Sequence, residues 1–228
     1  MKSWTCALLG ILMGGTAVAD DTTADADKGF VVPEGFELRM LEPLGGRVAR
    51  PNGWFYREAH DAASFKWVLS AENPEDGPYQ TGVRIQLIAA VQAKTGQSAK
   101  AFVEEFLEGR RASAKVIDEC PVEDQGLLTR TCIRTEESIP SANSEEPFQI
   151  QYSVFWGNDL DVALFVTSGT LASRWAEYQP LFEEIEKFEL IDLDRFDGNG
   201  QPLTDEPAKD EGEAIDEDAA VEPNDGSE

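Results

Sequence analysis

Histidine and cysteine are scarce in this chain of 228 residues, which has one histidine, His60, and three cysteines. A zinc or redox centre built from these residue types would need a cluster of them or a Cys-x-x-Cys pair, and neither is present. His60 is not accompanied by a Gly-x-Ser-x-Gly motif, so the sequence does not indicate a hydrolase with an activated serine. We interpret His60 as a surface-loop residue and expect no catalytic residue, no metal and no cofactor.

Basic residues are also few, with 19 Lys and Arg against 44 Asp and Glu and a net charge of −25. Such a chain is repelled by nucleic acid and by anionic membranes, so neither is an expected partner. Residues 197–228 hold twelve acidic residues and one lysine, with few large apolar residues. This composition predicts a disordered acidic tail, whose charge favours solubility.

Weak calcium binding through that tail is an alternative. Asp192, Asp194, Asp197 and Asn199 resemble part of a calcium loop. The register does not fit an EF-hand, because Phe196 would stand at a ligand position. We therefore predict no EF-hand here.

No apolar run is long enough to span a bilayer comfortably. The chain opens with Met1 and Lys2, continues with a short apolar stretch, and reaches Ala17-Val18-Ala19 before Asp20. This is the pattern of a cleaved secretory signal. We predict a signal peptide over residues 1–19 with cleavage after Ala19, a flexible leader over 20–29, and a periplasmic or secreted protein without a membrane span in its mature form.

Cys120 and Cys132 would be the only cysteines left after that cleavage. They are placed symmetrically about Gly126, so a hairpin that turns through residues 123–126 would set them opposite one another on neighbouring strands. In an oxidising compartment this predicts a disulfide. Two buried free thiols are the alternative.

The clearest helical pattern follows Ser98, a suitable N-cap, with apolar residues at helical spacing: Ala99, Phe102, Val103, Phe106 and Leu107. We expect the helix to end near Gly109, or a turn later, and to cover the strand through Val83 and Ile85. Alternation predicts strands at 54–58, 64–70, 83–92, 115–120, 127–135, 148–156 and 162–166. A last helix is expected over 171–190, with Pro180 kinking it or starting a new one, inside one globular domain over 30–196.

The order of these elements resembles the PsbP/Mog1-like superfamily. The likeness spans about residues 46–190 and depends on the Pro51-Asn52-Gly53-Trp54 turn, the helix through Phe102, Phe106 and Leu107, and the ending Glu177-Tyr178-Gln179-Pro180-Leu181-Phe182. It implies an α+β fold, an antiparallel β-sheet flanked by helices in an α/β/α sandwich. It also implies a domain that is usually not an enzyme and that acts in photosystem assembly, in binding a small GTPase, or as a secreted bacterial protein.

We therefore predict a non-catalytic binding or assembly module outside the cytoplasm, with a protein or a small molecule as its ligand. The alternative from another class is a secreted hydrolase built on two carboxylates, although in so acidic a chain the presence of such a pair carries no information. Ser168-Gly169-Thr170 could bind an anion at the start of a helix, and a plain turn is the simpler interpretation.

Overall fold

A computed structural model of the chain describes residues 29–142 and 144–191. The predicted signal peptide (1–19), nearly all of the leader (20–29) and the acidic tail (197–228) lie outside the described residues, as do Asp192, Asp194 and Phe196. The elements follow in the order β1 (Phe36–Leu41), β2 (Gly45–Pro51), β3 (Phe55–Glu58), β4 (Phe65–Ser70), β5 (Gly82–Ala89), α1 (Val91–Thr95), α2 (Ala99–Ser113), β6 (Lys115–Glu119), β7 (Glu123–Asp124), β8 (Leu128–Glu137), the 3₁₀ turn η1 (Pro140–Ala142), β9 (Phe148–Gly157), β10 (Val162–Leu171), the 3₁₀ turn η2 (Ala172–Arg174), α3 (Trp175–Ile185) and β11 (Glu189–Ile191).

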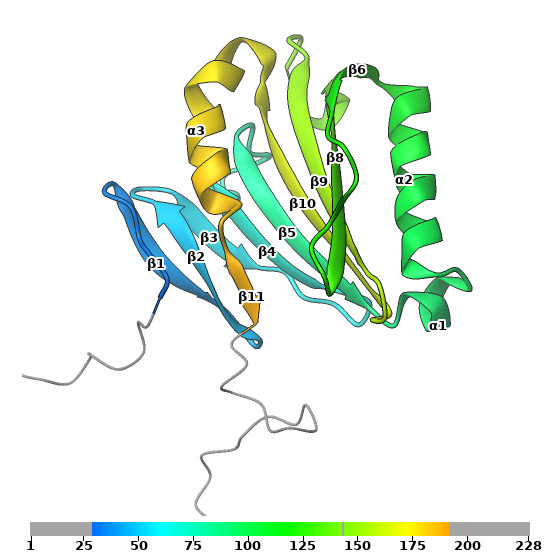
Figure 1. Cartoon of the computed structure of the whole chain (residues 1–228). Helices are drawn as coiled ribbons and strands as arrows, with labels where there is room; N and C mark the ends of the chain where they lie inside the picture. The colour runs from blue at the N-terminus through cyan, green and yellow to red at the C-terminus, as the bar shows by residue number, and fades with distance from the viewer. Residues whose placement is uncertain (1–28, 143, 192–228) are drawn as a thin grey trace, which may run out of the picture.

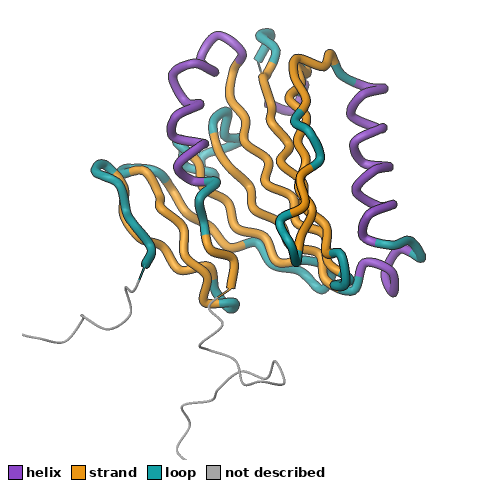
Figure 2. Tube along the Cα trace, in the orientation of Figure 1, coloured by secondary structure: helices purple, strands orange, loops and turns teal. Residues whose placement is uncertain are grey.

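The strands form two antiparallel sheets. The larger one has the order β3-β4-β5-β10-β9-β8-β6, with β7 paired to β8, and the smaller one has the order β1-β2-β11. Helices α2 and α3 lie on opposite sides of the large sheet, and the small sheet lies on the α3 side (Figure 1; Figure 2). The α+β fold predicted from the sequence, an antiparallel sheet flanked by helices, is confirmed.

The two sides of the large sheet have separate cores because successive side chains of a strand point to opposite faces. We call these sides the α2 face and the α3 face. The core of the α3 face joins α3 to β5, β10 and β2 through buried residues that include Val83, Ile85, Leu164, Phe182 and Ile185. The core of the α2 face joins α2 to β8, β9 and β10 through residues that include Val103, Leu107, Ile133, Val154 and Phe165.

Helix α2 starts where the sequence predicted, but it lies on other strands. The Ser98 hydroxyl accepts a hydrogen bond from the backbone N–H of Ala101 at 3.2 Å, and the helix passes through Gly109 to Ser113. The predicted contact with Val83 and Ile85 is wrong, since both residues belong to the α3-face core. The physical reason is the alternation of β5: its most apolar face is the one turned towards α3.

One local prediction, the turn over residues 51–54, is confirmed, and two others need correction. The turn after β2 is closed by the Trp54 N–H on the Pro51 carbonyl at 3.1 Å, so Pro51 opens the turn and Gly53, with φ +79°, occupies the position that favours glycine. Ser168–Thr170 forms neither a turn nor a helix start, because it continues strand β10. The last helix is shorter than the expected 171–190, and Pro180 lies inside it, so Pro180 does not start a new helix.

Strand β11 was not predicted. Its three residues pair with β2, with Glu189 opposite Arg47 and Ile191 opposite Gly45. The segment is too short to display an alternation of its own, so only its place beside β2 defines it as a strand.

Candidate functional site

A cavity of about 330 Å³ opens on the α2 face beside the C-terminal half of α2. Its floor lies where β5, β10 and β9 run side by side. Gly82 pairs with Gly169, and Gly169 pairs with Ile150. Two neighbouring strand positions therefore carry no side chain, and this leaves a hollow in a sheet surface that side chains would otherwise fill.

The ring of Tyr79 closes one end of this hollow. A Cβ on Gly82 would come within 3.0 Å of the Tyr79 ring and 2.6 Å of the Leu69 carbonyl oxygen, so the ring can lie against β5 only because residue 82 is glycine. Burial raises the pKa of the Tyr79 phenol, and the nearby positive charges of Arg84 and Arg57 oppose that rise. The phenol is therefore a neutral hydrogen-bonding group at neutral pH.

Helix α2 forms the opposite wall through Phe106 and Arg110, and the 139–142 segment closes the third side. The Phe106 ring packs edge-on against Tyr152 at 5.4 Å and Phe165 at 4.9 Å between centroids. The guanidinium of Arg110 lies over the rings of Phe106 and Tyr152, at 5.1 and 5.2 Å. This stacking positions a cation at the wall of a partly aromatic cavity.

The positive charge of Arg110 is partly neutralised by the carboxylate of Glu137. Its Nη1 lies 3.4 Å from Glu137 Oε2 and 3.4 Å from the Tyr152 hydroxyl, and that hydroxyl donates to Glu137 Oε1 at 3.1 Å. Burial, together with the Glu137 charge, raises the pKa of Tyr152 to about 12. Arg110 thus helps to build the wall and is not a free charge.

The described residues that line the cavity include no aspartate, glutamate, histidine, cysteine or lysine. They are Pro78, Tyr79, Gln80, Gly82, Arg84, Phe106, Arg110, Ile139, Ser141, Ala142, Phe148, Ile150, Tyr152, Thr167 and Gly169. A surface free of carboxylates is notable in a chain with 44 acidic residues. The lining offers aromatic area, a few hydroxyl groups and two arginines, which is a composition suited to binding.

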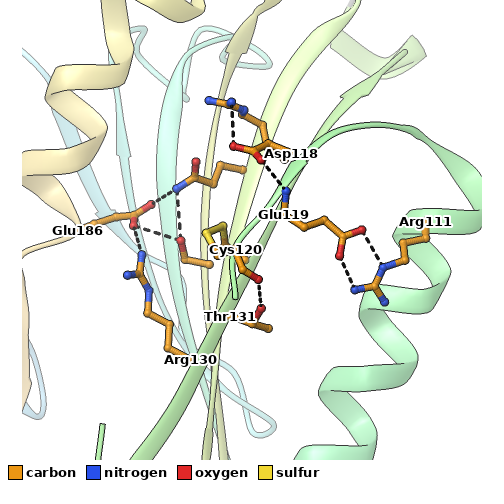
Figure 3. Close-up of a disulfide and its surroundings, with 11 residues drawn as sticks. Arg111, Asp118, Glu119, Cys120, Arg130, Thr131 and Glu186 are labelled. Carbon is orange, nitrogen blue, oxygen red and sulfur yellow. Dashed lines mark hydrogen bonds and ion pairs between the residues drawn. A yellow bond between two sulfur atoms is a disulfide. The ribbon is translucent and has the colours of Figure 1, made fainter. Parts of the chain in front are cut away.

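A second polar cluster lies on the α3 face, around the carboxylate of Glu186 at the end of α3 (Figure 3). Its Oε2 accepts from Ser153 Oγ at 3.1 Å and Arg130 Nη2 at 3.3 Å, and its Oε1 accepts from Gln151 Nε2 at 3.3 Å. Within the described part of the chain, the groups that hydrogen bond to Glu186 include no second carboxylate. The cluster therefore does not provide the acid and base pair that a carboxylate-based hydrolase needs.

Cys120 and Cys132 form a disulfide beside this cluster, with their Cα atoms 4.9 Å apart (Figure 3). The Cys120 N–H donates to the Cys132 carbonyl at 3.0 Å, so the residues face one another as the symmetry about Gly126 predicted. The connection between β6 and β8 is more structured than a plain turn, because β7 within it also pairs with β8.

His60 follows β3 in a short connection to β4. Its Nδ1 accepts the backbone N–H of Lys66 at 3.1 Å, and its ring lies edge-on against Phe65 and Trp67, at 5.5 and 5.3 Å. Its Nε2 is 3.4 Å from a carboxylate oxygen of Glu58. These partners include no hydroxyl or thiol that the imidazole could activate.

Sequence reasoning missed the cavity. Tyr79 stands between the predicted strands 64–70 and 83–92, and Gly82 lies at the edge of the second of them. The signal that could have found the site is a glycine inside a strand, as at Gly169, since it often marks a close approach of another group. The cavity also needs the register between strands far apart in the sequence, which no local pattern gives.

Over residues 29–142 and 144–191, no three His, Cys, Asp or Glu side chains are grouped closely enough to hold a metal ion. In the same residues, no helix has the length and apolar character needed to cross a bilayer.

The molecule is thus an α+β domain with a partly aromatic cavity on one face of its large sheet. No protein-family model and no curated protein matches the sequence. Among solved structures, it is similar to cyanobacterial PsbP from Synechocystis, with 15% identity and a TM-score of 0.43 over 71% of this chain and 96% of that one. It is likewise similar to the Ran-binding protein Mog1p of Saccharomyces cerevisiae, with 15% identity and a TM-score of 0.43 over 70% and 97% of the two chains.

A protein of unknown function from Pseudomonas aeruginosa is also similar, with 12% identity and a TM-score of 0.39 over 67% of this chain and 94% of that one. Two of these structures, PsbP and Mog1p, carry the names of the superfamily that the sequence resembles. These likenesses concern the fold, and we take no ligand or partner from them.

Proposed function

We propose that this chain is a non-catalytic binding module that acts outside the cytoplasm and holds a small molecule in the cavity beside α2. The observation that carries the proposal is the lining of that cavity. It combines the aromatic side chains of Tyr79, Phe106, Phe148 and Tyr152 with a volume of about 330 Å³, which lies within the range of small-molecule sites.

The same lining supports a binding role over a catalytic one. General acid–base and nucleophilic catalysis at neutral pH rely mostly on histidine, carboxylate, cysteine or lysine side chains, and the described residues around the cavity supply none of these. Its hydroxyl groups belong to Ser141, Thr167 and two tyrosines, and Tyr152 is held neutral by its raised pKa. A ligand bound here would therefore be released without chemical change.

The test is a fluorescence titration with 1-anilinonaphthalene, an uncharged aromatic amine whose emission rises in an apolar site. We expect one equivalent to bind and to be recovered unchanged. Gly169→Val should weaken binding, because a Cβ at Gly169 has only ordinary contacts, the nearest at 3.5 Å, and the added methyl groups would fill the floor. Gln149→Val, which places valine on the opposite face of the sheet, is the control.

Binding that both variants leave intact would overturn the assignment of the cavity, and so would the absence of binding to the folded wild type. Recovery of a chemically altered ligand would contradict the non-catalytic role. A melting curve for each variant shows whether the fold is retained.

The extracytoplasmic part of the proposal rests on the Cys120–Cys132 disulfide, because disulfides persist mainly in oxidising compartments. It is tested by fractionating cells that produce the full chain and sequencing the N-terminus of the product. We expect the mature protein to start at Asp20 and to leave the cytoplasm. An uncleaved chain retained in the cytoplasm with free thiols would contradict it.

A further inference from the structure

Two arginines on the α2 face have no acidic partner among residues 29–142 and 144–191. Among the residues that the structure describes, every other arginine forms an ion pair with a carboxylate. Arg57 and Arg84 form neither an ion pair nor a side-chain hydrogen bond within the described part of the chain, and both are exposed. In a protein with 44 acidic and 19 basic residues, two neighbouring arginines without a carboxylate need an explanation.

The strand register places these two arginines together. Val68 of β4 pairs with Arg57 of β3 on one side and with Arg84 of β5 on the other. Arg57 and Arg84 therefore share the α2 face at a distance of two strand spacings, roughly 10 Å between backbones. Both lie close enough to Tyr79 to influence its phenol electrostatically.

Arg84 also lines the cavity. Within one row across the sheet, Arg84 pairs with Thr167, and Thr167 pairs with Tyr152. The guanidinium of Arg84 therefore stands at the rim of the cavity on the side away from α2, with Arg57 further out along the same face. The cavity thus has an aromatic interior and an uncompensated positive rim.

We propose that the ligand of this cavity is an amphipathic anion, a molecule whose aromatic or aliphatic body fills the hollow while its carboxylate or sulfonate group binds Arg84, with Arg57 as a second cation. The proposal rests on the proposed function and assigns its substrate class. Arg84 is then the residue that selects charged ligands over neutral ligands of the same shape.

The chemistry favours arginine for this role. A guanidinium presents paired N–H donors that match an oxyanion in a two-point contact, and it keeps its charge at any physiological pH. A carboxylate beside Arg84 would neutralise the rim, and none of the described residues that line the cavity carries one. The acidic surface elsewhere repels anions, so the rim is where an anionic group can bind favourably.

The experiment compares two probes that differ in one charged group: 1-anilinonaphthalene-8-sulfonate and the uncharged 1-anilinonaphthalene. Both are titrated by fluorescence against the full chain and against Arg84→Gln, Arg57→Gln and Arg111→Gln. Arg111→Gln is the control, because it also removes one positive charge. Arg111 pairs with Glu119 at 2.8 Å and does not line the cavity.

We expect the sulfonate to bind more tightly than the neutral amine, and added salt to weaken only the sulfonate. Arg84→Gln should weaken sulfonate binding about tenfold, the size of one lost hydrogen bond to a charged group, and leave the neutral amine unaffected. Arg57→Gln should have a smaller effect in the same direction, and Arg111→Gln should have little.

Equal affinity for the two probes, or sulfonate binding that Arg84→Gln leaves intact, would overturn the inference. Those results are distinguishable from failure of the proposed function, in which the neutral amine does not bind or Gly169→Val does not weaken it. Arg84 and Arg57 are exposed, so we expect their substitution to leave the fold intact. A melting curve for each variant checks that loss of binding is not caused by unfolding.

Discussion

Arg130 donates a hydrogen bond to Glu186 at 3.3 Å, yet the pKa of Glu186 is raised above its ordinary value. The main cause is burial, since the side chain of Glu186 is 13% exposed, and loss of water disfavours the charged form. The bonds from Ser153, Arg130 and Gln151 act in the opposite direction and do not cancel it. Glu186 thus carries a net desolvation cost when ionised.

This cost makes Glu186 a source of pH dependence. The pKa of Glu186 is higher in the folded chain than in the unfolded chain. Between these two pKa values the folded chain binds more protons, so the contribution of Glu186 to stability falls as pH rises through that window. The free energy of unfolding of Glu186→Gln minus that of the wild type should therefore increase from about pH 4 upwards and level off above the folded pKa of Glu186.

Urea unfolding at a series of pH values measures this difference. Glu183→Gln, on the exposed side of the same helix, is the matched control for removal of one carboxylate. A Glu186→Gln difference that does not change with pH, or that decreases as pH rises, would contradict the account of a desolvated carboxylate.

The Cys120–Cys132 disulfide closes a loop with a sequence separation of 12 and holds β6, whose residues are all exposed, to the edge of the large sheet. Closing a loop of this size stabilises a protein by about 3 kcal/mol, mostly by restricting the unfolded chain. We expect Cys120→Ala/Cys132→Ala to lower the free energy of unfolding by about 2–3 kcal/mol.

Denaturation with and without a reductant tests this value. The reductant should lower the midpoint of the wild type and leave that of the double variant unchanged. The intact wild type should also be two hydrogens lighter than its reduced form. Thiols that react with an alkylating reagent before reduction would show that the bridge is absent.

Local patterns predicted α2 and most strands of the large sheet. Ser98 marks the start of α2, Cys120 and Cys132 pair about Gly126, and the alternation from Phe148 to Trp156 predicts β9. Each of these signals lies within one segment, where helical spacing, strand alternation and turn geometry decide the structure. They required no knowledge of distant partners.

The features that the sequence did not predict depend on contacts between residues far apart along the chain. β11 is a strand only because Glu189 meets Arg47, and the cavity exists only because Gly82 meets Gly169. The face covered by α2 was misassigned because Val83 and Ile85 are apolar enough to suit either helix. Which helix covers them is decided by the packing of the whole sheet.

The corrected position of α2 gives a prediction about its buried residues. Leu107 is 4% exposed and packs in the α2-face core, whereas Glu108 is exposed. Leu107→Ala should lower the free energy of unfolding by about 2–5 kcal/mol, through lost burial and the cavity left behind. Glu108→Ala should change it by less than about 0.5 kcal/mol. Equal shifts of the two denaturation midpoints would show that the helix presents another face.

Replacement of glycine by alanine is expected to change the free energy of unfolding in opposite directions at Gly109 and Gly46. Gly109 lies inside α2 with no atom within 4 Å of an added Cβ, whereas a Cβ on Gly46 would come within 2.2 Å of the Leu190 carbonyl oxygen and 2.3 Å of that of Glu189. Gly109→Ala should therefore stabilise the protein by about 0.5–1 kcal/mol, since alanine restricts the unfolded chain and favours a helix. Gly46→Ala should destabilise it by about 1–3 kcal/mol, because β11 must move off β2 to make room.

The two variants are compared by thermal and urea unfolding, with amide hydrogen exchange of residues 189–191 as a local readout. We expect Gly46→Ala to speed exchange where β11 pairs with β2, and Gly109→Ala to leave it unchanged. The comparison separates local crowding from any general effect of alanine, because the added methyl group is the same in both. A stabilising Gly46→Ala would mean that β11 does not lie against β2 in solution, and a destabilising Gly109→Ala would mean that α2 is packed on that side.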